Sequence, residues 1–168
     1  MHDFTDADWA GSPTERKSTS GGIFSLGSTT VSWYNKKQIS VALSSVEEKY
    51  MAAIQTTCEA TWMRNILVGL FGSHLDPTVI HCDNQSCIKL SINPVFHDRS
   101  KHIDIQYHHI RDCVQWKIML LQYIPMEDQD VDILTKAVDR RKFEYHRGRI
   151  GVKDNSYLVE RECSYSTR

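Results

Sequence analysis

Three aspartates in distant segments are the side chains whose type and position suggest chemistry. Asp6 lies in an expected strand near the start of the chain, Asp83 follows a short apolar run, and Asp132 lies in a late helical segment. Asp8 is two residues beyond Asp6 and shares its face of the strand. Because the ends of neighbouring strands in an open α/β sheet border one cleft, Asp6 and Asp83 are expected to converge there.

Carboxylates gathered from distant segments predict a site for divalent cations. Like charges at close range are costly, and a bound cation removes that cost. Hard oxygen ligands suit Mg²⁺, and two such ions roughly 4 Å apart can activate a water and stabilise the leaving oxygen when a phosphodiester is cleaved. Aspartate is also common at turns and helix caps, so the spacing alone favours the alternative that these are surface and capping carboxylates.

The composition is that of one ordinary globular domain. The chain has 168 residues, of which 40% are hydrophobic and 24% charged, with a formal net charge of −1. No apolar run is long enough to cross a membrane, so no membrane partner is expected. The five cysteines include no C-x-x-C pair, which predicts a reduced intracellular protein without a zinc site but does not separate cytoplasm from nucleus.

Basic residues occur in local groups despite the near-zero net charge. These groups are Arg16–Lys17, Lys36–Lys37, Arg99 with Lys101, and Arg140–Arg141–Lys142. Each group taken singly is interpreted as a solvated surface. A nucleic-acid footprint follows only if the fold brings several of them onto one face.

The spacing of apolar residues predicts a meander of strands, a long helix, and then strands connected by helices. The expected strands are 3–9, 23–26, 29–34, 39–43, 79–82 and 118–124, and the expected helices are 45–67, 83–90, 103–117, 128–136 and 140–149. Ser45 with Glu48 three residues later predicts a capping box. This order predicts an α/β domain with a mixed sheet over residues 1–152, followed by a polar, disordered tail over 153–168.

A series of motifs in the chain resembles the ribonuclease H domain of copia-type LTR retrotransposon polyproteins. The motifs are Phe4-Thr5-Asp6-Ala7-Asp8-Trp9-Ala10-Gly11, Arg16-Lys17-Ser18-Thr19-Ser20-Gly21-Gly22, Val31-Ser32-Trp33, Lys36-Lys37-Gln38, Ala42-Leu43-Ser44-Ser45, Cys82-Asp83-Asn84-Gln85-Ser86, Ser100-Lys101-His102-Ile103-Asp104-Ile105 and Asp132-Ile133-Leu134-Thr135-Lys136. They occur in the family's order and cover about residues 3 to 151.

The resemblance implies a fold, a reaction and a set of site residues. The fold is ribonuclease H-like, with a mixed five-stranded sheet flanked by helices. The reaction is hydrolysis of the RNA strand in RNA–DNA hybrids with Mg²⁺ (or Mn²⁺) in a two-metal site. Asp6, Asp83 and Asp132 match catalytic, metal-binding carboxylate positions, and Asn84 and Gln85 are candidate contacts to the nucleic-acid backbone. The implied partners are the hybrid and the reverse transcriptase domain of the same polyprotein.

The sequence departs from the family at the fourth carboxylate position. The family's glutamate before a tyrosine is replaced by Lys49, which precedes Tyr50. Glu48 is adjacent, but neighbouring helical residues point about 100° apart. Position 48 is expected on a polar outer side of the helix, where Glu48 would cap Ser45 rather than replace the missing ligand.

Lys49 leaves open whether the chain is an enzyme. One interpretation is a ribonuclease H impaired by the lysine, which removes a ligand and places a positive charge beside Asp6 or Asp83. The alternative is a degenerate retroelement relic, either non-enzymatic or a weak hybrid binder. An integrase of the same superfold is disfavoured by the segment from Asp132 to Lys136.

Overall fold

A computed structural model describes residues 1–8, 11, 14–72, 75–92 and 104–153. The protein is built around a five-stranded mixed sheet. The strands are β1 (His2–Asp8), β2 (Thr19–Leu26), β3 (Thr29–Lys37), β4 (Thr78–Cys82) and β5 (Met119–Tyr123), in the order β3-β2-β1-β4-β5. The first three are antiparallel, whereas β4 is parallel to both β1 and β5. The predicted mixed five-stranded sheet is therefore confirmed.

The hairpin of β2 and β3 turns at Gly27, whose φ of 63° lies in the left-handed region that glycine adopts without strain. The alternation predicted for β3 is present, and its Thr29, Val31 and Trp33 face is exposed. The extended segment predicted at 39–43 is wrong. β3 instead continues to Lys37, and residues 38–44 form an irregular segment with bends at 39–40 and 43–44. Leu43 in this segment is 84% exposed and contributes nothing to a core.

The long helix α1 (Ser45–Phe71) begins one residue earlier than its predicted cap implies. Its N-cap is Ser44, whose side chain accepts a hydrogen bond from the Glu47 backbone N–H at 3.2 Å. The Glu47 carboxylate in turn accepts from the Leu43 backbone N–H at 2.8 Å. The predicted pair of Ser45 and Glu48 is therefore wrong by one position, and the helix ends at Phe71, with Gly72 as its C-cap, rather than near 67.

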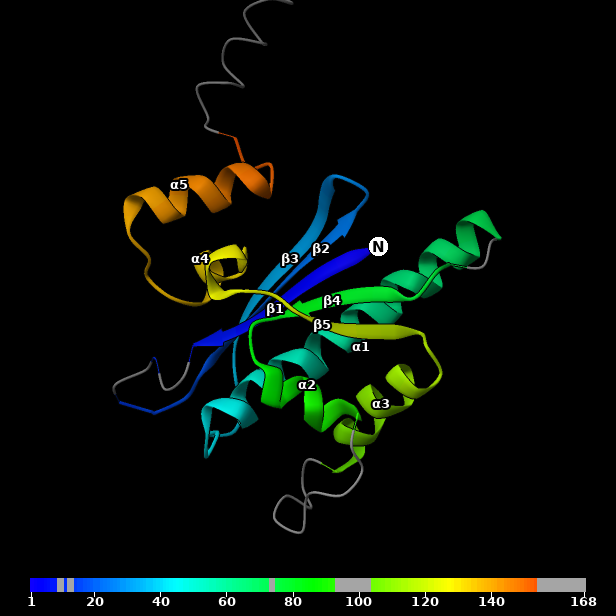
Figure 1. The fold of residues 1–168 in the computed structure, drawn as a ribbon, viewed down its shortest axis with the longest axis horizontal. Helices are drawn as coiled ribbons and strands as arrows, with labels where there is room; N and C mark the ends of the chain where they lie inside the picture. Colours follow the sequence, from blue (N-terminus) through cyan, green and yellow to red (C-terminus); the bar gives the residue numbers. More distant parts are fainter. Residues whose placement is uncertain (9–10, 12–13, 73–74, 93–103, 154–168) are drawn as a thin grey trace, which may run out of the picture.

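The helices form a layer on each face of the sheet (Figure 1). On one face α1 packs against α2 (Gln85–Ile92) and α3 (Asp104–Gln115). Apolar side chains between this layer and the sheet form two clusters, one around Tyr50 and Ile110 and the other around Phe24 and Ile80. No described helix is long and apolar enough to cross a membrane.

The second face carries the C-terminal elements. A 3-10 turn (Met126–Asp128) leads into α4 (Asp132–Thr135), which is followed by α5 (Arg140–Arg149). α4 lies so close to β2 that a Cβ on Gly21 would stand 2.7 Å from Val131 Cγ1, so glycine is required there for the contact. Residues 154–168 of the predicted tail, and the Arg99 and Lys101 group, lie outside the described residues.

Candidate active site

The three sequence-predicted aspartates lie at one end of the sheet, on three different elements. Asp6 is near the C-terminal end of β1, Asp83 follows the last residue of β4, and Asp132 is the first residue of α4. All three side chains are buried. Parallel β1 and β4 present their C-terminal ends at the same edge, which explains why Asp6 and Asp83 meet.

Lys49 in the first turns of α1 joins two of these carboxylates. Its ammonium donates to Asp6 Oδ1 and lies 2.7 Å from both oxygens of Asp83. Burial acts to lower the pKa of Lys49, but the charges and hydrogen bonds of Asp6 and Asp83 raise it above its ordinary value. Burial raises the pKa of Asp6, and the Lys49 ammonium opposes that rise. Lys49 is therefore a fixed cation between two buried acids.

Two further lysines hold the third carboxylate. Lys136 Nζ lies 2.8 Å from Asp132 Oδ1 and 3.8 Å from Asp6 Oδ2. Lys142 Nζ in α5 lies 2.5 Å from Asp132 Oδ2. Burial acts to raise the pKa of Asp132, but the hydrogen bonds from these two lysines outweigh it and lower that pKa.

The contacts join into a chain of alternating charges, which we call the ion-pair chain. In order, it contains Asp83, Lys49, Asp6, Lys136, Asp132 and Lys142. It ties the ends of β1 and β4 to α1, α4 and α5. The hydroxyl of Thr135 adds a hydrogen bond to Asp6 Oδ2 at 2.7 Å. Sequence reasoning did not assign Lys136 and Lys142 to the site, and the only signal for either was the four-residue spacing of Lys136 from Asp132.

The structure corrects the placement of Glu48. This side chain was expected on a polar outer side of α1, but it is only 2% exposed, and its burial raises the pKa to about 7. The side chain instead points toward β2, where it forms a hydrogen bond with Ser18, and Gln38 fixes the first turn of α1 against the same strand. Gln38 donates from one amide group to the Glu48 carbonyl at 2.9 Å and to the Ser20 hydroxyl at 2.8 Å. Two adjacent sides of the helix are therefore buried rather than one.

The candidate nucleic-acid contacts Asn84 and Gln85 lie beside Asp83, at the start of α2. The Asn84 side chain accepts a hydrogen bond from the Cys87 backbone N–H at 2.9 Å and caps the helix. Gln85 is exposed. Asp8, the last residue of β1, is half-buried at the same end of the sheet.

The residues present do not match a two-metal site. Magnesium requires oxygen ligands that are free to coordinate it. Here the Lys49 ammonium stands between Asp6 and Asp83, and each aspartate contacts at least one lysine. Within the described ranges, no group of three or more histidine, cysteine or acidic side chains is arranged to hold a metal ion.

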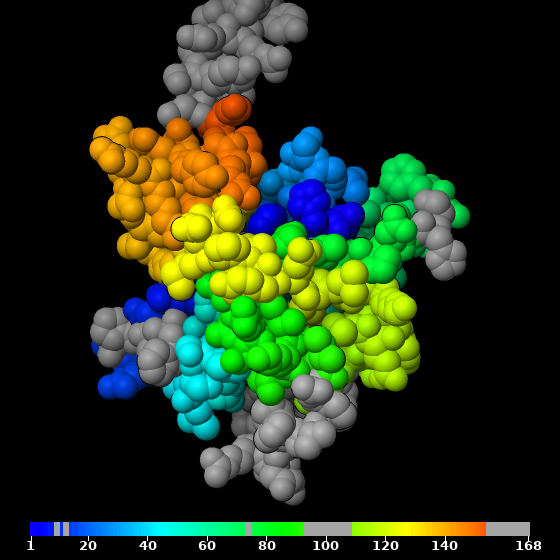
Figure 2. All heavy atoms as spheres, in the orientation of Figure 1, coloured from blue at the N-terminus to red at the C-terminus, as the bar shows by residue number. Residues whose placement is uncertain are grey.

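Several basic groups lie at the same end of the sheet as the aspartates. Lys36 pairs in register with Ser20, the partner of Ala7, and Lys37 pairs with Thr19, the partner of Asp8. Arg16 and Lys17 lie two to three residues before the start of β2 at Thr19, which pairs with Lys37. Arg140 and Arg141 begin α5 beside Lys142. In Figure 2 the orange atoms of α5 lie directly against the yellow atoms of the 125–136 segment.

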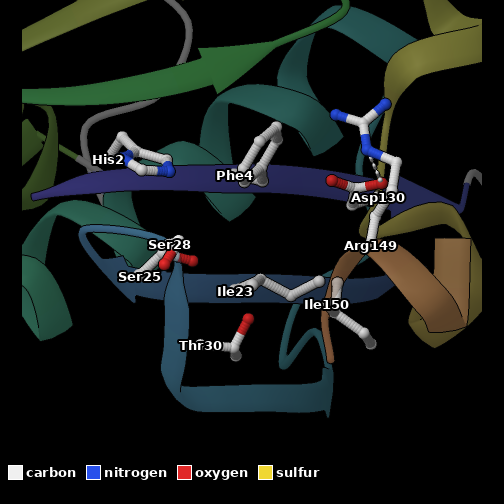
Figure 3. Close-up of a pocket in the computed structure, with 9 residues that line it drawn as sticks. All are labelled: His2, Phe4, Ile23, Ser25, Ser28, Thr30, Asp130, Arg149 and Ile150. Atoms are coloured by element: carbon white, nitrogen blue, oxygen red, sulfur yellow. Dashed lines mark ion pairs between the residues drawn. The ribbon is translucent and has the colours of Figure 1, made fainter. Parts of the chain in front are cut away.

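A separate cavity of about 230 Å³ lies toward the opposite end of β1 (Figure 3). Phe4 and Ile23 line it from the strands, and Asp130 and Arg149 form an ion pair at 3.2 Å on its wall. The same Asp130 oxygen lies 2.7 Å from Nδ1 of the buried His146, which fastens α5 to the preceding loop. These contacts serve the packing of α5, and the cavity is distinct from the aspartate site.

Comparison with known proteins identifies relatives over most of the chain, although no established family profile matches it. It is 41% identical over 152 residues to the retrovirus-related Pol polyprotein from transposon TNT 1-94 of Nicotiana tabacum, covering 90% of this chain and 11% of the relative. It is also 41% identical over 152 residues to the Pol polyprotein from transposon RE1 of Arabidopsis thaliana, covering 90% of this chain and 10% of that protein. The chain thus spans about a tenth of these relatives.

Solved structures give the same fold. The structure of LC11-RNase H1 in complex with RNA/DNA hybrid matches with a TM-score of 0.54 at 13% identity, covering 80% of this chain and 92% of that one. The resemblance inferred from the motifs is therefore confirmed. The chain is homologous to a segment of the retrovirus-related Pol polyproteins of plant transposons, and it has the ribonuclease H fold.

Proposed function

We propose that this chain is a retroelement ribonuclease H domain that binds RNA–DNA hybrid at the end of the sheet holding Asp6, Asp83 and Asp132, and that Lys49 suppresses its hydrolysis of the RNA strand. The reverse transcriptase part of the same polyprotein is the proposed covalent partner, because the relatives are Pol polyproteins. The reaction proposed for the intact site is metal-dependent hydrolysis with Mg²⁺ or Mn²⁺.

Two observations support hybrid as the ligand. LC11-RNase H1, which has this fold, has been solved in complex with RNA/DNA hybrid. In addition, the fold brings the basic groups at Arg16, Lys36 and Arg140 to the end of the sheet that holds the aspartates. Cationic side chains around a site bind nucleic-acid backbones without reading their sequence.

The contacts of Lys49 are the observation on which suppression rests. A two-metal mechanism needs carboxylate oxygens that fix both ions. Lys49 removes one ligand and engages the oxygens of Asp6 and Asp83. A unit charge ~4 Å from a monovalent cation costs roughly 4 kcal/mol at an effective dielectric near 20, and a divalent ion is repelled more strongly. That is about three powers of ten in cation affinity.

The competing function is hybrid binding without any residual catalysis, as expected of a degenerate relic. The ion-pair chain favours it, because each of its three aspartates already has a lysine partner. The two functions differ in what Lys49→Glu does. An otherwise intact ribonuclease H regains activity, whereas a relic with further damage does not.

The test compares the chain with Lys49→Glu in cleavage of a labelled hybrid at saturating Mg²⁺, with Mg²⁺ affinity measured by calorimetry. We expect cleavage to rise by at least 100-fold and Mg²⁺ affinity to rise with it. Lys117→Glu makes the same charge change at an exposed position after α3 and should change neither. Full activity of the unmodified chain would contradict the role of Lys49. Failure of Lys49→Glu to gain both properties would leave hybrid binding alone as the function.

A further inference from the structure

The aspartate site presents its lysines, rather than its carboxylates, to solvent. The side chains of Asp6 and Asp132 are 0% exposed, whereas those of Lys136 and Lys142 are each 28% exposed. Lys49 lies between these extremes, with 11% of its side chain exposed. The outer layer of the ion-pair chain is therefore cationic, and the acids lie beneath it.

The contacts also show which lysines have ammonium N–H donors that are not directed at a carboxylate of the chain. A lysine ammonium has three N–H donors. Lys49 directs its donors to Asp6 and to both oxygens of Asp83. Lys142, by contrast, contacts one carboxylate at 2.5 Å among the described residues, and Lys136 has one close contact at 2.8 Å. Both outer lysines can therefore accept a further anionic partner without breaking the chain.

Lys136 also keeps its charge. Burial acts to lower the pKa of Lys136, but Asp132 and Asp6 raise it above its ordinary value. The exposed Arg141 lies next to Lys142 at the start of α5 and extends the cationic surface. In Figure 1, this end of α5 lies on the side of the molecule where β1 ends.

We propose that Lys136 and Lys142 bind phosphate groups of the nucleic-acid backbone directly, so that this domain holds hybrid without a divalent cation. This inference rests on the proposed function for the identity of the nucleic acid. Lys49 acts as the anchor that neutralises Asp6 and Asp83 beneath the phosphate. The buried acids hold the two outer ammoniums in place, and the phosphate makes charge-assisted hydrogen bonds to their remaining donors.

The experiment measures binding of a fluorescent RNA–DNA hybrid to the full chain by anisotropy, first in EDTA and then in Mg²⁺. We expect the same affinity in both. Lys136→Gln and Lys142→Gln should each weaken binding in EDTA by about 3- to 10-fold, and each should reduce the slope of log affinity against log salt by about one. Lys117→Gln is the matched control and should leave affinity unchanged. Lys142→Arg keeps the charge and should bind within about 2-fold of the unmodified chain.

A second arm needs no variant and separates free phosphate from backbone phosphate. Inorganic phosphate titrated into the unmodified chain in EDTA should shift the NMR signals of the Lys136 and Lys142 side chains and leave Lys117 unshifted. If circular dichroism shows that a glutamine variant is unfolded, the phosphate titration of the unmodified chain decides whether the two lysines bind phosphate.

The outcomes distinguish the two proposals. A requirement for Mg²⁺ in hybrid binding, unchanged affinity in both folded glutamine variants, or absence of phosphate shifts at the two lysines would overturn direct phosphate binding and leave the proposed function standing. No binding of hybrid by the folded, unmodified chain under either condition would contradict the proposed function itself.

Discussion

A lysine differs from a metal ion as a neutraliser of buried acids, and Lys49 shows the consequences. Its charge is tethered to α1, and its three donors are already used by Asp6 and Asp83. It cannot bind a water and lower its pKa as a metal does. What it does is remove the cost of burying two carboxylates, which is large when a buried charge has no partner. At position 49, the same side chain therefore neutralises two buried acids and, under the proposed function, opposes catalysis.

Asp3 is a buried acid without such a partner, and it predicts a dependence of stability on pH. It is fully buried in β1, and that burial raises its pKa from 3.8 to about 7. The folded state therefore holds a proton that the unfolded chain releases between about pH 4 and 7. Because the folded state binds more protons in this window, the free energy of unfolding falls as pH rises through it. Above about pH 7, the folded chain contains a buried charge.

The prediction is that Asp3→Asn stabilises the protein at pH 8 and flattens its stability between pH 4 and 8. The gain should be about 1–3 kcal/mol, the cost of an unsatisfied buried polar group. Urea denaturation at several pH values measures it. Asp76→Asn, at an exposed position, is the control. The part of the slope that remains is expected from Glu48, whose pKa is also about 7. A variant less stable than the parent at pH 8 would show that Asp3 is paired in solution.

At the residue scale, the sequence predicts the aspartates better than their partners. Asp6, Asp83 and Asp132 each follow a local signal, a strand end or a helix start, and the structure brings them to one end of the sheet. Lys142 gives no such signal, because it lies ten residues from Asp132 and reaches it only through the packing of α5 on α4. Long, flexible side chains find their partners through tertiary structure.

At the scale of elements, two adjacent serines could each serve as the N-cap that starts α1. Ser44 and Ser45 are both good N-caps, and Glu47 and Glu48 are both good partners. Local sequence does not separate these two registers. The contacts of Gln38 with Ser20 and with the Glu48 carbonyl separate them, because they fix the first turn against β2. That long-range contact is why the predicted boundary is one residue late.

The observed register predicts unequal effects of two adjacent substitutions. Ser44→Ala removes the cap on the Glu47 N–H and should lower the free energy of unfolding by about 1 kcal/mol. Ser45→Ala leaves that cap in place and should change stability by less than about 0.5 kcal/mol. Thermal and urea denaturation of both variants provide the measurement. A larger loss for Ser45→Ala would place the cap where the sequence alone suggested it.

At the scale of the whole molecule, a near-neutral chain concentrates basic groups at one end of its sheet. The formal net charge is −1, so attraction to nucleic acid must come from the local arrangement of charge rather than from its sum. The register of β2 and β3 and the packing of α5 create this arrangement. The sequence predicts four such groups, and only the fold shows that the three within the described residues share an end of the sheet.

This distribution predicts how the whole domain binds hybrid. Affinity should be independent of sequence and should fall steeply with salt, because contacts to phosphates release counterions without reading bases. Titration of unrelated hybrids at several salt concentrations measures both properties. Lys36→Gln should weaken binding to every hybrid alike, whereas Lys117→Gln should not. A strong preference for one sequence, or affinity that does not change with salt, would count against this surface.

The position of Lys49 in the ion-pair chain has a consequence for how this gene can change. Lysine and glutamate codons differ at a single nucleotide, so one point mutation exchanges the two residues. The glutamate form would place four acids together. Magnesium bound to these acids in the folded state would raise the free energy of unfolding, so the stability of this form would depend on the magnesium concentration. The lysine form folds without magnesium. Under the proposed function, one nucleotide change would therefore exchange a domain that folds without magnesium for one whose stability depends on it.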